Sequence, residues 1–153
     1  MALPNIFTKP VADEVIGRFN NLTPQTIPGW GKMNVAQMLA HCNVSYELVY
    51  DENKHPKPKG LMKLILKLFV KNAVVSEKPY KKGGPTAPAF IINDERDFET
   101  EKARLIAYIE KTQQLGQSTF DGKMSHSFGP LSITEWNNMF YKHLNHHLTQ
   151  FGN

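Results

Sequence analysis

Apolar residues recur at helical spacing in several segments of the chain. Between residues 10 and 22, Val11, Val15, Ile16 and Phe19 fall on one side of a helix, because positions three and four apart share a face. The same spacing predicts helices over residues 35–51, 61–74, 95–115 and from residue 132 onward. No segment alternates apolar and polar residues as a half-buried strand does. The pattern therefore predicts an all-α fold.

Capping signals and breakers place the ends of these helices. Asn34 is a suitable N-cap for the second helix, and Asn93 or Asp94 for the fourth. Ser132 and Glu135 form a capping-box pattern before the last helix. Proline and glycine collect in the connections, over residues 23–33, 54–60, 76–93 and 116–131. These features predict one domain, residues 1–153, that folds as a four-helix bundle with long irregular loops and room for one extra short helix.

The third helix has an unusual distribution of side chains. Lys63, Lys67 and Lys71 recur four apart and form one narrow stripe, while the remaining positions are apolar. A helix that is apolar around most of its circumference is buried on more than one side or covered by a partner. We therefore expect residues 61–75 to be buried, or to form the interface of a homodimer.

The distribution of charge limits the kinds of molecule that the protein is expected to bind. The formal net charge is +4, and residues 54–82 contain nine lysines and one glutamate. This block has no aromatics interleaved at stacking spacing and no arginine cluster, so we expect no nucleic-acid binding. A stripe of solvated lysines is a simpler interpretation than a surface that binds anions or a membrane. Residues 61–75 are too short and too charged to span a bilayer, so no stable membrane insertion is expected.

Cys42 is the only cysteine, so the chain cannot form an intrachain disulfide. A reducing compartment fits this composition, and the first residues show no basic segment followed by an apolar run. We therefore expect a cytoplasmic protein. Cys42 follows His41 directly, and consecutive helical residues point about 100° apart, which favours a small core residue over a nucleophile.

The stretch YKHLNHHLTQ, residues 141–150, carries the most informative polar residues. His143 and His147 are four apart and interrupt the apolar stripe of the last helix, and His41 borders the apolar stripe of the second. If those two helices are neighbours, three imidazoles can hold one metal ion, and three protein ligands leave open the positions that a catalytic site needs. The glutamate of the HExxH signature is absent. The alternative is that each histidine is a hydrogen-bonded polar residue without a metal.

Several residues that neighbour these histidines in sequence, or that lie in a loop able to approach them, could support the rings, although each also has a simpler role on a helix surface or in a loop. These are Gln37, Ser45, His126, His146 and Gln150. His55 lies in the lysine-rich connection and is expected on the surface. Trp30 and Trp136 are candidates for the mouth of a pocket, or for the core.

Two segments resemble the DinB/YfiT-like superfamily of metalloenzymes, and most closely a branch catalogued as a domain of unknown function. They are WGKMNVAQMLAHC, residues 30–42, and HSFGPLSITEWNNMFYKHLNHHLTQFG, residues 126–152. The resemblance implies an up-down-down-up four-helix bundle with a divalent metal, typically zinc or nickel, bound by His41, His143 and His147. It also implies that a low-molecular-weight thiol can serve as cosubstrate in transferase or isomerase reactions.

Two classes of function follow. The first is a metal-dependent enzyme, a thiol-dependent S-transferase or a hydrolase, acting on a small molecule at the three histidines. The second is a non-catalytic helical binding or dimerisation module that uses residues 61–75. The sequence does not choose between them, because a fold resemblance does not fix a reaction.

Overall fold

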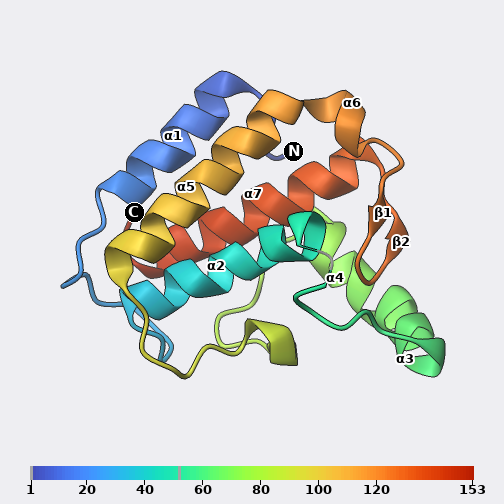
Figure 1. Cartoon of the computed structure of the whole chain (residues 1–153), viewed down its shortest axis with the longest axis horizontal. Helices are drawn as coiled ribbons and strands as arrows, with labels where there is room; N and C mark the ends of the chain where they lie inside the picture. The colour runs from blue at the N-terminus through green and yellow to red at the C-terminus, as the bar shows by residue number, and fades with distance from the viewer. Residues whose placement is uncertain (1, 52) are drawn as a thin grey trace.

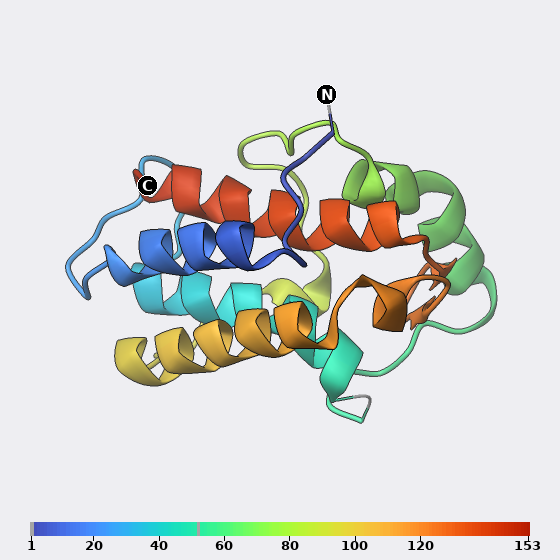
Figure 2. The ribbon, with the colours of Figure 1, turned by 90° about the horizontal axis from the view of Figure 1, so that it is seen from above.

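Four long helices form the body of the protein in the computed structural model, which describes residues 2–51 and 53–153. They are α1 (Lys9–Asn20), α2 (Val35–Tyr50), α5 (Phe98–Leu115) and α7 (Ile133–Gln150). They lie side by side, with α1 and α7 running in one direction and α2 and α5 in the other (Figures 1 and 2). The expectation of a mainly helical protein is confirmed. Met1 and Glu52, which the expected domain includes, lie outside the described residues.

Shorter elements connect the long helices. After α2 the chain forms α3 (Gly60–Ile65), the π-helical turn η1 (Leu66–Val70) and α4 (Lys71–Val75) without a break. We call this continuous stretch, residues 60–75, the helical arm. A 3-10 turn η2 (Pro88–Phe90) lies in the next loop, and the short helix α6 (Gln117–Phe120) follows α5. Strands β1 (Met124–Ser125) and β2 (Gly129–Pro130) pair antiparallel just before α7.

Two of the predicted helix starts are confirmed and one is wrong. Asn34 caps α2 and Ser132 caps α7, each in a reciprocal capping box with the side chain three residues later. Helix α5 begins later than expected, at Phe98, because the Asp97 carboxylate accepts a hydrogen bond from the Thr100 amide at 2.8 Å. The predicted cap at residues 93 and 94 is therefore incorrect.

Aromatic residues fill the core between the long helices. Phe140, on α7, stacks between Tyr46 and Trp136 with ring centroids 4.9 and 5.5 Å away. Trp136 is 1% exposed, and Phe120 closes the same cluster. Burying a side chain of this size contributes about 1.5–3 kcal/mol. This packing fixes how α7 is rotated, and so decides where the histidines farther along the helix point.

Two further expectations require correction. The short antiparallel strand pair was missed, because two residues per strand are too few for period-two alternation to appear in the sequence. The helical arm was expected to be buried on more than one side or covered by a partner. The first alternative is wrong, because Leu61 and Phe69 are 72% and 77% exposed, and the second stays a prediction. Only its end, around Val75, packs against the core. In the described part of the chain, no helix has both the length and the apolar character needed to cross a bilayer.

Candidate metal centre

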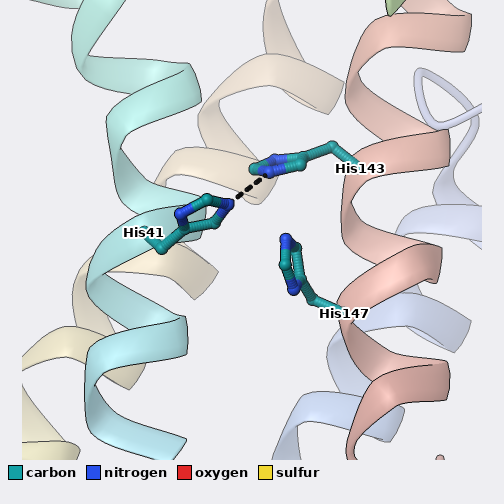
Figure 3. Close-up of side chains that lie close together, drawn as sticks. All are labelled: His41, His143 and His147. Carbon is teal, nitrogen blue, oxygen red and sulfur yellow. Dashed lines mark hydrogen bonds between the residues drawn. The ribbon is translucent and has the colours of Figure 1, made fainter. Parts of the chain in front are cut away.

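Three imidazole rings meet between α2 and α7 (Figure 3). His41 projects from α2, and His143 and His147 project from successive turns of α7. One ring nitrogen from each lies within 4.8 Å of the other two. His41 and His147 are buried and His143 is half-buried. The sequence-based expectation that these rings would lie close together is therefore met, and the arrangement is compatible with a metal ion.

Each ring is held through its Nδ1 atom. His41 Nδ1 lies 2.7 Å from the carbonyl oxygen of Phe90, and His147 Nδ1 lies 2.7 Å from Oε1 of Gln150. His143 Nδ1 lies 2.9 Å from the hydroxyl of Ser45. Hydrogen bonds of this kind, made by the nitrogen that does not bind the ion, orient the histidines of metal sites.

The partners determine which ring nitrogen carries the proton. A carbonyl oxygen only accepts, so His41 must donate from Nδ1 to Phe90 and keep a lone pair on Nε2. The same holds for His147, because the Gln150 amide donates its Nε2–H to the Trp30 carbonyl and so turns its oxygen toward the ring. His143 differs, because the Ser45 hydroxyl can either donate or accept. Two of the three rings therefore present an unprotonated Nε2.

A glycine allows the Gln150 contact. Gly31 has φ +86°, and a Cβ at this position would lie 2.7 Å from the Gln150 Nε2 atom. A larger residue would therefore strain the backbone and push the Gln150 amide away. The loop before α2 thus orients His147 indirectly, through Gln150.

The surroundings keep the three imidazoles neutral. Burial lowers the pKa of His147 to about 3, and repulsion from the nearby His41 adds to this. Burial also lowers the pKa of His143 well below its usual range, with further contributions from His147 and His41. For His41, burial lowers the pKa more than the hydrogen bond to Phe90 raises it. A neutral imidazole is the form that binds a metal ion.

The histidines open into a cavity of about 660 Å³. Its described lining contains no aspartate or glutamate, and includes exposed loop residues such as Lys81 and Gly83, so it communicates with solvent. Tyr80 and Phe90, from the loop between the arm and α5, stand edge-on to His143 at ring distances of 6.4 and 5.7 Å. The site is therefore shielded by apolar groups but remains accessible.

Some of the residues expected to support the histidines contact them in the structure, and others do not. Ser45 and Gln150 touch His143 and His147, as described above. Gln37 instead completes the capping box with Asn34 and donates to the Asp94 carbonyl at 3.2 Å, so its bonds position the start of α2. His146 lines the cavity with its ring 5.1 Å from that of His147.

The remaining histidines lie away from the three rings. His126, in the turn between β1 and β2, lines the cavity but bonds to the Ser127 hydroxyl and the His55 carbonyl. His55, which was expected on the surface, is only half-buried, and its Nε2 lies 2.8 Å from the buried Glu47 carboxylate.

The two tryptophans and the cysteine can also be placed. Trp30 lines the cavity with the Lys82 ammonium 4.1 Å above its ring. Trp136 both belongs to the core and contributes to the cavity wall. Cys42 is fully buried, and burial raises the pKa of its thiol far above the normal range, so it is not an available nucleophile.

Sequence reasoning missed Phe90, whose carbonyl holds His41. No local pattern marks it, because the two residues are 49 apart and the bond uses a backbone atom that every residue carries. Tyr80 was missed for a similar reason. It lies in a loop rich in proline and glycine, with no periodicity to assign it a direction.

The fold and the site define the chain as a helical protein with a three-histidine cluster at an accessible cavity. The chain belongs to the family described as protein of unknown function (DUF1569), whose family model matches residues 5–153. This match includes both histidine-bearing helices. Comparisons with curated proteins and with solved structures found no match.

Proposed function

We propose that the protein is a DinB-like enzyme that binds one divalent metal ion through Nε2 of His41, His143 and His147. The observation that supports this is the orientation of the rings. Each Nδ1 has a hydrogen-bonding partner, while the Nε2 atoms of His41 and His143 approach to 2.9 Å. A purely structural role for the histidines would not require three rings to gather their remaining nitrogens at one place.

The donor set favours certain metals. Imidazole suits zinc, nickel, copper and iron, whereas magnesium and calcium prefer oxygen ligands. Three neutral imidazoles, with no carboxylate among the described residues that line the cavity, fit zinc or nickel best. Three protein ligands leave room for an exogenous one.

The proposed chemistry is activation of a thiol or a water for attack on a small molecule. A bound zinc or nickel ion would act as a Lewis acid that deprotonates a coordinating thiol and lowers the pKa of a bound water to about 7. The absence of a carboxylate base from the described lining favours the thiol, whose deprotonation on the metal needs no strong base. Thiol-dependent S-transfer is therefore the preferred reaction, and hydrolysis the alternative.

Among the protein's own groups, His146 is best placed to accept a proton. It lines the cavity beside His147, and burial and the nearby Lys82 lower its pKa, so the ring is neutral at pH 7. Trp30 and Tyr80 flank it with ring distances of 5.8 and 5.6 Å, which fixes its position. We assign it the role of a base rather than of a ligand.

The DinB-like arrangement is part of this proposal. It is supported by the directions of the four long helices, in which α1 and α7 oppose α2 and α5 (Figures 1 and 2). We also propose that the whole chain is one domain, because the four helices share one cluster of buried side chains.

Elemental analysis of the purified protein tests the metal site. We expect one equivalent of zinc or nickel in the wild type and little in His143→Ala. His146→Ala is the matched control, because it removes an imidazole from the same cavity and should keep the metal. Metal-free wild-type protein that also fails to take up added zinc would contradict the proposal. A conjugation screen with several thiols, run on the loaded protein, then separates S-transfer from hydrolysis.

A dimerisation module is the second candidate, and the exposed arm favours it. Leu61, Leu68 and Phe69 are between 62% and 77% exposed, which is unusual for large apolar residues so close together. We propose that two copies of the chain pair through the arm. Light scattering after size exclusion should then give a dimer that Phe69→Asp dissociates, whereas Ile27→Asp, on an exposed residue of a different loop, should not. A monomeric wild type would contradict this proposal.

A further inference from the structure

The cavity extends well beyond the three histidines along α7. Its lining includes one face of this helix: Trp136, Met139, His143, His146, His147 and Gln150. At 1.5 Å per residue, the seven positions from His143 back to Trp136 correspond to about 10 Å. The histidines thus occupy the middle of an elongated space rather than its end.

Helix α2 supplies the opposite wall of the part toward Trp136. Ser45 contacts His143 while His41, one turn earlier, lies beside His147, so the two helices run antiparallel. The next turn of α2 therefore faces the first turns of α7. That turn contributes Leu48 and Val49 to the cavity lining.

The helical arm supplies the third wall. Leu66, Val70 and Val74 recur four apart on the arm and line the cavity, while Leu68 on the same segment is 62% exposed. The arm therefore presents one apolar face to the cavity and another to solvent. We call the space between α2, the start of α7 and the arm the apolar chamber.

The chamber offers a ligand few polar partners. Two lysines line the cavity, but both lie beyond the other end of the histidine cluster. Lys32 follows Gly31, which lies against Gln150. Lys81 precedes Lys82, whose ammonium lies over the Trp30 ring. The polar side chains of the β1–β2 turn, which also lines the cavity, are engaged within the protein. Ser125 donates to the Gly129 carbonyl, and both ring nitrogens of His126 have partners.

We propose that the apolar chamber binds the hydrocarbon part of the substrate, a chain or ring system about 10 Å long, whose polar head group lies at the three histidines. Apolar walls favour such a ligand because each buried methylene contributes about 0.8 kcal/mol. The position of the head group rests on the proposed metal site, whereas binding of the hydrocarbon part does not.

A series of straight-chain alkyl hydroxamates tests this, because the hydroxamate group coordinates zinc while the chain length varies. Calorimetry on protein loaded with one equivalent of zinc should show affinity rising about fourfold per added methylene. Octanohydroxamate has six more methylenes than acetohydroxamate and should therefore bind roughly 4,000-fold more tightly. The gain should stop once the chain exceeds the length of the chamber. Equal affinity across the series would overturn the inference.

Two leucines of the arm provide a matched pair of variants. Leu66→Asp places a charge in the chamber and should weaken octanohydroxamate at least tenfold, leaving acetohydroxamate and zinc content unchanged. Leu68→Asp places the same charge on the exposed face and should change neither. If Leu66→Asp does not fold, Val70→Asp makes the same test. Equal effects of the Leu66 and Leu68 substitutions would contradict the assignment of the chamber.

The failure of the metal proposal can be told apart from the failure of this one. On zinc-free protein, displacement of an apolar fluorescent probe by alkyl alcohols of increasing length reports on the chamber alone. Chain-length dependence in a protein that never binds zinc would keep the chamber and reject the metal site. Zinc binding with no chain-length dependence in either assay would keep the metal site and reject the chamber.

Discussion

The Nε2 atom of His41 lies 2.9 Å from the Nε2 atom of His143. His41 donates its proton from Nδ1 to the Phe90 carbonyl, so its Nε2 carries a lone pair that points toward the second ring. This contact is favourable only if His143 carries a proton on Nε2, or if the two nitrogens share a cation. His143 can adopt either form because its Nδ1 faces a hydroxyl, which donates in the first case and accepts in the second.

Ser45 should therefore affect metal affinity without touching the ion. We expect Ser45→Ala to weaken zinc binding about 10- to 100-fold, because His143 loses the partner that orients its ring. Competition with a chromophoric chelator measures this. Ser127→Ala, which removes a hydroxyl from another part of the cavity lining, is the control and should bind zinc like the wild type. Equal affinities of Ser45→Ala and wild type would show that the hydroxyl has no such role.

The metal-free protein should lose stability as the pH falls from 7 to 5. Unfolded histidines take up protons near their ordinary pKa of 6.5, whereas burial lowers the pKa of folded His147 to about 3. The unfolded state then binds more protons, so the free energy of unfolding decreases below pH 6.5. For His147 alone the loss is about 2 kcal/mol between these pH values.

Urea unfolding of zinc-free protein at several pH values measures this loss. His147→Gln removes the titrating ring and should show a shallower decline than the wild type. Identical pH dependence in the two proteins would mean that His147 is not protected from protonation in the folded state.

A buried carboxylate on α2, that of Glu47, should contribute to stability through its three partners. The Glu47 carboxylate is 5% exposed and contacts Lys54, His55 and Arg104 within 2.8 Å. Burial alone would raise the pKa of Glu47, but hydrogen bonds from these three groups lower it below its ordinary 4.5. This part of the stability is present above pH 4.5 and is lost as the carboxylate becomes protonated in acid.

Glu47→Ala should therefore lower the free energy of unfolding by about 1.5–3 kcal/mol, because it removes the shared hydrogen-bond acceptor of three partly exposed groups. Asp13→Ala is the comparison, since it breaks the exposed Lys9–Asp13 pair and should cost less than about 1 kcal/mol. Denaturant unfolding at pH 7 measures both variants. Similar small losses of unfolding free energy in the two variants would show that water can replace the Glu47 carboxylate as the partner of these groups.

Local features of the sequence were sufficient to locate the four long helices. Apolar spacing located all four long ones, and the capping residues Asn34 and Ser132 fixed two starts to the residue. The start of α5 was misplaced because several acidic residues precede it, and only the chain's path determines which one reaches the first turn. The strand pair at residues 124–130 was too short to leave a pattern.

For the site, the sequence by itself determined that His143 and His147 share a face, since helical geometry places residues four apart together. It could only suggest His41, whose approach depends on α2 packing antiparallel to α7. Tertiary structure alone decided that the Phe90 carbonyl and Ser45 orient the rings, that the arm leaves one apolar face in solvent, and that the cavity extends toward Trp136. The reason is that these contacts join residues far apart in the chain, and their geometry follows from how buried side chains such as Phe140 set the rotation of each helix.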